Sequence, residues 1–175
     1  MNNLLYLFII FFMIHEFEEI ILINCWMKKK QEYLILKHPI LSKYTIKKMK
    51  AISTAAFALA VFEEYIILVT ITLSAIYFNF YNLWIGVFMA FFFHLIIHVL
   101  QWLVVRIYIP SIVSSFICIP FCIYTFKRII FTTDIDSLVV WTLIGILIVA
   151  FNLNLAHKIA KKFDDKIINI NNKNK

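Results

Sequence analysis

The sequence predicts an all-α protein that crosses a membrane several times as one helix bundle. Of its 175 residues, 63% are hydrophobic, whereas soluble domains average about 45–50% apolar. The apolar residues form five long segments, at residues 4–27, 51–78, 83–105, 112–126 and 138–155. Each approaches the ~20 residues that a helix needs to cross a bilayer. We therefore expect five transmembrane helices.

Polar stretches and prolines separate these segments. A basic loop is expected from Lys28 to Lys50, and a short turn at residues 79–82. Pro110 disfavours helix at the residue before it and divides the third segment from the fourth. We expect one five-helix domain at residues 1–160, with its first segment retained as a membrane helix. A polar cytoplasmic tail is expected at residues 161–175.

The lysines predict the orientation, because cytoplasmic loops carry an excess of Lys and Arg. The loop after the first segment is the most basic stretch, so the N-terminus is expected outside and the C-terminus inside. Lys127 and Arg128 fall on the outside and depart from this rule. Trp26, Tyr81 and Trp84 are expected to anchor segment ends at the interface. The net charge is +7, but the Lys and Arg residues that produce it are not interleaved with aromatic residues on a folded surface. The sequence therefore predicts membrane lipid as the partner, not nucleic acid.

A cluster of ionisable residues lies inside the apolar segments. An ionised carboxylate at a helix centre costs about 2.5–3.5 kcal/mol to insert. Five such residues would together cost on the order of 12–17 kcal/mol, namely Glu16, Glu18, Glu19, Glu63 and Glu64. Protons, mutual hydrogen bonds or a bound cation must offset this cost.

Depth and helical phase predict that the cluster forms one site. The acidic pair at 63–64 and the histidines at 94 and 98 lie at the depth of residues 15–19, roughly 17–24 Å from their helix starts. His15, Glu18 and Glu19 share one helix face, as do His94 and His98. Glu16 lies on the flank of its helix, nearer to a supporting position.

Imidazole and carboxylate ligands indicate a divalent transition metal, zinc or iron. The predicted ligands are His15, Glu18, Glu19, Glu63, Glu64, His94 and His98. Glu63 or Glu64 is expected to remain free as a general base, so these two are also the catalytic candidates.

One string of residues resembles a known family. His15-Glu16-Phe17-Glu18-Glu19 is similar to the motif of the HXXEE-domain proteins, bacterial membrane proteins of five predicted helices. The resemblance implies a further histidine, which would be His94 or His98, and a Tyr-x-Pro-Gly string. Tyr108-Ile109-Pro110-Ser111 stands in that place with Ser for Gly, which leaves open whether the backbone takes a positive φ there. The family implies the bacterial cytoplasmic membrane but no activity.

Two other families fit less well. Intramembrane CAAX-type glutamate proteases carry an Arg four residues after a paired Glu, and here Leu68 and Ile23 stand in those places. Membrane fatty-acid hydroxylases use about eight histidines in boxes, and this chain has five His in all.

Three functions remain open from the sequence. The first is a metal-dependent enzyme that acts on a lipid or a membrane-embedded substrate, with hydrolysis favoured over oxidation. The second is a proton- or ion-coupled transporter that uses the same groups as a relay and forms its path by homo-oligomerisation. The third is a non-catalytic assembly protein whose polar cluster holds helices together.

Overall fold

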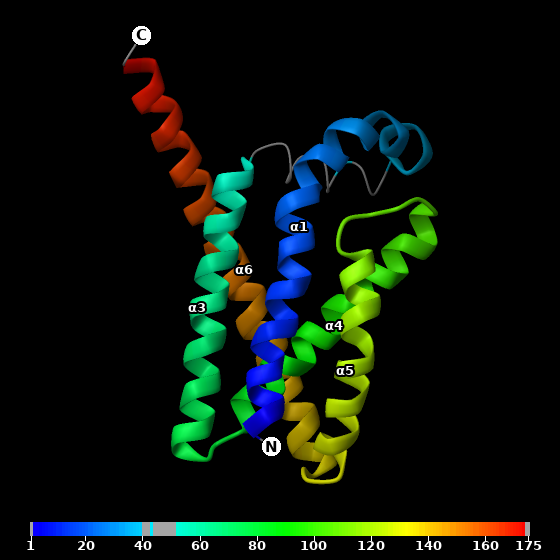
Figure 1. Ribbon diagram of the computed structural model, residues 1–175, viewed down its shortest axis with the longest axis vertical. Helices are drawn as coiled ribbons and strands as arrows, with labels where there is room; N and C mark the ends of the chain where they lie inside the picture. Colours follow the sequence, from blue (N-terminus) through cyan, green and yellow to red (C-terminus); the bar gives the residue numbers. More distant parts are fainter. Residues whose placement is uncertain (1, 40–42, 44–51, 174–175) are drawn as a thin grey trace.

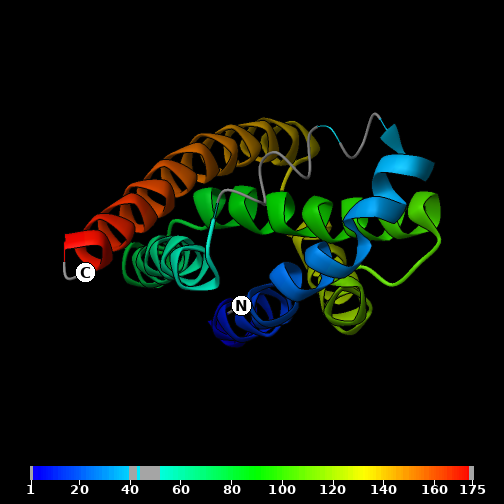
Figure 2. The ribbon, with the colours of Figure 1, turned by 90° about the horizontal axis from the view of Figure 1, so that it is seen from above.

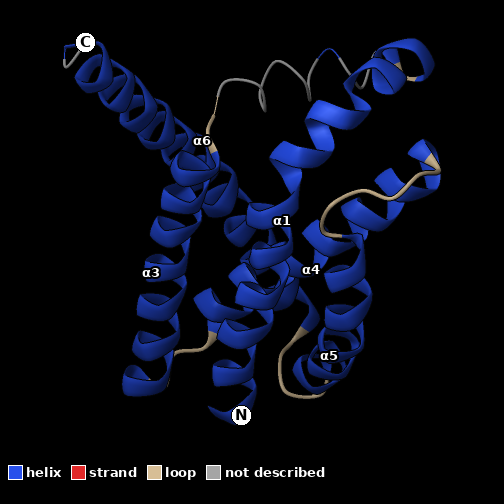
Figure 3. Cartoon of the chain, turned by 45° about the horizontal axis from the view of Figure 1, so that its top comes forward, coloured by secondary structure: helices blue, strands red, loops and turns tan. Residues whose placement is uncertain are grey.

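The chain folds into a bundle of α-helices. The computed structural model describes residues 2–39, 43 and 52–173. Within these ranges it contains only helices and loops (Figures 1 and 3), which confirms the all-α class. The long helices among the described residues are α1 (Asn2–Lys37), α3 (Thr54–Phe78), α4 (Asn82–Val105), α5 (Ile112–Ile130) and α6 (Ile135–Lys173).

Several helices continue past the apolar segments that predict them. The prediction of a loop from Lys28 was wrong as far as Lys37, because α1 continues to that residue. Its last turns contain Lys, Gln, Glu and Leu, which favour helix, and the helix ends just before Pro39. Most of the remaining predicted basic loop, at residues 40–42 and 44–51, lies outside the described residues. At the other end of the chain, α6 covers most of the predicted polar tail.

Four of the helices are long and apolar enough to cross a membrane: α3, α4, α5 and α6. The first helix is not among them, because three carboxylates lie within four residues near its middle. Only 11% of the most apolar stretch of α6 is buried inside the structure. Lipid is the natural solvent for such an outward-facing apolar surface, so the fold is that of a multi-pass membrane protein.

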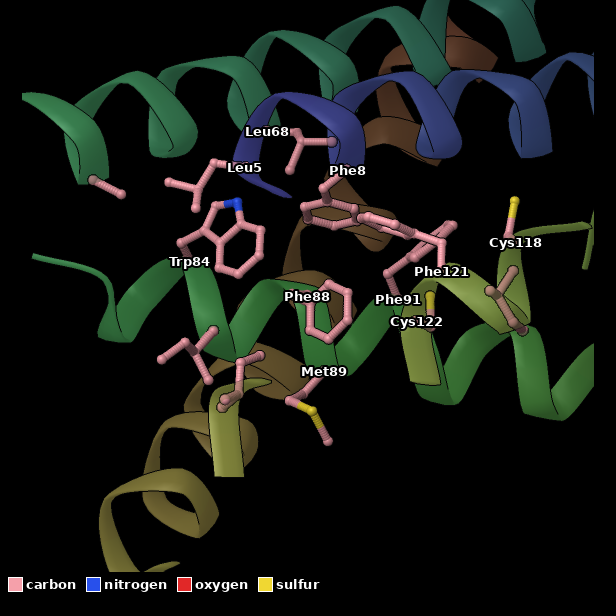
Figure 4. Packing of buried hydrophobic residues seen from close by; sticks show 14 of the residues in the cluster. Leu5, Phe8, Leu68, Trp84, Phe88, Met89, Phe91, Cys118, Phe121 and Cys122 are labelled. Atoms are coloured by element: carbon pink, nitrogen blue, oxygen red, sulfur yellow. The ribbon is translucent and has the colours of Figure 1, made fainter. Parts of the chain in front are cut away.

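An aromatic core joins α1 to α4 (Figure 4). The ring of Phe8 lies 5.6 Å from Trp84, 5.5 Å from Phe88 and 5.3 Å from Phe91, measured between centroids. Trp84 stacks on Phe88 and is 1% exposed. The prediction that Trp84 anchors the helix at the interface was therefore wrong. The first turn of α4 packs against the start of α1, where it contacts Leu5 and Phe8.

Helix α6 packs across α4 (Figures 1 and 2), and the two glycines of the chain meet between these helices. A Cβ atom on Gly86 would lie 2.2 Å from the carbonyl oxygen of Trp141, and one on Gly145 would lie 2.1 Å from the carbonyl oxygen of Gly86. Small residues permit such close approach of membrane helices. The same helix packs on α3 through alanines and through Asp164, which accepts hydrogen bonds from Ser53.

Candidate metal centre

Four side chains from α1 and α4 converge in the interior of the bundle. His15 and Glu19 stand one turn apart on α1, and His94 and His98 stand one turn apart on α4. One nitrogen or oxygen atom from each lies within 4.8 Å of the others. The predicted shared depth of the two helices accounts for this meeting. These four residues could hold a metal ion.

The distances suit a small cation. Four ligands at 2.0–2.1 Å around tetrahedral zinc lie about 3.3 Å from one another. The Nε2 atoms of His94 and His98 lie 2.9 Å apart, and His98 Nε2 lies 3.0 Å from Glu19 Oε1. His15 Nε2 lies 3.9 Å from the same oxygen. Each of these three distances differs from the tetrahedral spacing by less than 1 Å.

Two serine hydroxyls orient the histidine rings. Ser114 Oγ donates to Glu18 at 2.6 Å and lies 3.1 Å from His15 Nδ1. A hydroxyl has one proton, so Ser114 accepts from Nδ1–H, and the lone pair of His15 is on Nε2. Ser111 Oγ lies 3.0 Å from His98 Nδ1 and so holds the second ring. Holding the far ring nitrogen in this way is typical of histidines that bind metals.

Ring nitrogens and a carboxylate crowd together at the centre. His98 Nε2 lies within hydrogen-bond distance of both His94 Nε2 and the Glu19 carboxylate. His15 Nε2 is buried and has no hydrogen-bond partner within the described part of the chain. Nitrogen and carboxylate oxygen atoms this close must share a proton or a cation. The donor set therefore fits a bound metal ion, or shared protons.

Glu18 faces α5 rather than this group. Its Oε2 atom accepts from the backbone N–H of Ser114 at 2.7 Å, and its Oε1 atom accepts from Tyr108 at 2.6 Å. Ser114 lies in the first turn of α5, where backbone N–H groups lack helical partners and the helix dipole favours negative charge. Glu18 thus caps α5 and holds the serine that orients His15.

The remaining acidic residues lie beside the group rather than within it. Glu16 is buried and lines a cavity together with Glu64, Glu19 and His94. Glu63 accepts a hydrogen bond from Asn152 of α6 at 3.1 Å. The structure thus gathers His15, Glu19, His94 and His98, and it places Glu18, Glu63 and Glu64 around them.

Sequence reasoning did not identify the supporting residues Ser111, Ser114 and Tyr108. Their signal was the Tyr-x-Pro-Ser string, followed by a second serine three residues later on the same helix face. Ser111 takes a φ of 78°, so the left-handed backbone is adopted here without glycine. The serine contributes a hydroxyl to the centre that glycine would lack.

Fold and site together define a membrane helix bundle with a largely buried His/Glu group. Over residues 6–125 the chain matches the family described as "Protein of unknown function with HXXEE motif". The match covers more than half of the chain, so the protein belongs to this family. No curated protein and no solved structure matches it.

Proposed function

We propose that the protein is a metal-dependent membrane enzyme that hydrolyses a lipid substrate, with zinc as the metal. The observation that supports it is that His15, Glu19, His94 and His98 each bring one possible ligand atom within 4.8 Å of the others. Zinc is favoured over iron because it prefers tetrahedral nitrogen and oxygen ligands. It also tolerates a fifth ligand in transition states, which leaves room for a substrate beside the four residues.

The cavity beside the candidate metal centre offers a place for a substrate. Glu19 and His94 belong to the group of four and also line this cavity, whose other lining residues are mostly apolar. A divalent cation held there would supply Lewis acidity and activate water at neutral pH. Glu64 lies on the α3 wall of the same cavity and is suited to accept the proton of that water. Glu63 accepts a hydrogen bond from Asn152 and so supports the side of the cavity that α6 forms.

We further propose that α1 also crosses the membrane, which gives five transmembrane helices in a bacterial cell membrane. The C-terminal ends of α1 and α6 lie at the same end of the bundle (Figure 1). Both ends carry lysines, including Lys28–Lys30 and Lys158. The excess of positive charge favours this end on the cytoplasmic side, with the N-terminus outside.

Metal analysis of the purified chain tests the first part of this proposal. The protein is purified without a histidine tag and analysed by inductively coupled plasma mass spectrometry. We expect about one equivalent of zinc in the wild type and a loss of it in the variant His94→Ala/His98→Ala. His38→Ala is the matched control, because His38 lies beyond the end of α1. Less than about a tenth of an equivalent of any transition metal in the wild type would refute the proposal.

Turnover tests the second part. The zinc-loaded protein in lipid nanodiscs is assayed with p-nitrophenyl octanoate, a single-chain ester. Glu64→Gln is expected to lower turnover by about 10²–10⁴-fold while the zinc content stays unchanged. Glu32→Gln is the control, because Glu32 is exposed near the end of α1. Equal rates for Glu64→Gln and the wild type would exclude Glu64 as the base.

A further inference from the structure

We propose that the cavity beside the metal centre binds one hydrocarbon chain of a single-chain lipid whose headgroup is a hydrogen-bond donor and is not anionic. This inference rests on the proposed function and deepens it by naming the substrate class. It follows from the shape, the volume and the charge of the cavity.

The cavity is elongated along the helices. On α3 its lining runs from Phe57 to Ile71, a rise of about 21 Å at 1.5 Å per residue. Asn24 donates to Thr54 at 2.9 Å, which sets the register of the antiparallel α1 and α3. From this contact, Phe8 of α1 lies level with Ile71.

Polar and apolar side chains occupy different levels of the cavity. The same register places Glu16 near the level of Glu64, about two turns from the apolar end that contains Phe8 and Ile71. His94 lies with these carboxylates, because it borders both the cavity and the candidate metal centre. The cavity therefore offers one apolar end to a chain and a polar middle to a headgroup.

The volume limits what can enter. The cavity measures about 150 Å³, and an apolar cavity of that size in a soluble protein accepts benzene. It therefore has room for about six carbons of one chain. Two acyl chains side by side would not fit, nor would a transmembrane helix, whose diameter is about 10–12 Å. The volume thus favours a single-chain lipid over a membrane peptide or a diacyl lipid.

The charge limits the headgroup. Three glutamates line the cavity, and no Lys or Arg is found among the described residues that line it. A fatty-acid carboxylate or a phosphate would find no cationic side chain to pair with in this lining, and any ionised glutamate beside it would repel it at low dielectric. A hydroxyl, an amide or an ammonium group would instead donate hydrogen bonds to the carboxyl groups of this lining.

Photolabelling of the zinc-loaded protein in nanodiscs tests this inference. Three probes share one saturated chain with a terminal diazirine and end in an alcohol, an amine or a carboxylate. A fourth probe carries the diazirine on a diacyl phospholipid. We expect the alcohol and the amine to label lining residues such as Leu68 and Phe91, about tenfold more than the carboxylate does. The diacyl probe is expected to label only outward-facing residues such as Leu147.

Two cavity-filling variants supply the contrast. Ala90→Phe and Val87→Phe each place a ring in the cavity, and cavity labelling is expected to fall about tenfold. Ala150→Phe is the matched control, because Ala150 is exposed on α6 outside the cavity. If the first variant fails to fold, the second, which starts from a larger side chain, provides the same contrast.

The outcomes separate this inference from the proposed function. Equal cavity labelling by the carboxylate or the diacyl probe would overturn the inference. So would labelling that is unchanged in a folded cavity-filling variant. Cavity labelling that persists in protein without metal would support the inference while the proposed function fails. A bound metal without any cavity labelling would do the reverse.

Discussion

Replacing Ser114 by alanine is expected to weaken zinc binding without unfolding the protein. The hydroxyl of Ser114 accepts from His15 Nδ1 at 3.1 Å, and His15 is fully buried. Its removal leaves a buried N–H without a partner, which costs about 1–3 kcal/mol. That is a loss of roughly 5–150-fold in affinity, in the range typical for partners that orient metal ligands. The backbone N–H of Ser114 still binds Glu18, so α5 remains capped.

The assay is competition between the protein and a chromogenic zinc chelator in detergent. Ser115→Ala is the matched control, because this neighbouring hydroxyl is equally buried but has no hydrogen-bond partner within the described residues. Its removal is expected to leave zinc affinity within about twofold of the wild type. Equal affinities for Ser114→Ala and Ser115→Ala would refute the role assigned to Ser114.

Two further predictions concern packing and backbone strain. Gly86→Ala is expected to lower the melting temperature, although alanine favours helix over glycine by about 1 kcal/mol. The reason is that its Cβ would meet the carbonyl of Trp141, and a rise would contradict the close crossing. Ser111→Gly should relieve the positive φ and raise the melting temperature yet weaken zinc binding, whereas Asn79→Gly, also at positive φ, should change stability alone. Unchanged zinc affinity in Ser111→Gly would refute the role of its hydroxyl.

The sequence predicted the four central residues of the site because their spacing along each helix determines which side chains share a face. Residues at i and i+4 share a helix face, so His15 pairs with Glu19 and His94 with His98 before any fold is known. Because the polar faces of α1 and α4 lie at the same depth in the membrane, they can face each other. The spacing does not indicate which other helix packs against the remaining faces of α1. Thus Glu18 was grouped with the ligands, whereas in the structure its carboxylate binds the start of α5. Glu16 was placed on the flank, and in the structure it lines the cavity beside the group.

Helix ends were predicted less well for a different reason. Hydrophobicity marks where lipid begins and ends, whereas a helix continues as long as its residues favour it. Lys28–Lys37 therefore extend α1, and the stretch after Leu155 extends α6. The Tyr-x-Pro-Ser string marks the place of Ser111 and Ser114 but does not reveal their role, because that role depends on a ring nitrogen supplied by another helix.

The position of α6 separates two properties of the protein along the chain. All four residues that could hold a metal lie within residues 6–125, which match the family, and α6 lies beyond them. Yet α6 forms one wall of the cavity, with Ile148 and Leu153 among its lining residues. One wall of the space beside the candidate metal centre is thus encoded apart from the stretch that holds the possible ligands. Exchange of the last helix between family members would be a modular route to a reshaped cavity beside an unaltered metal centre.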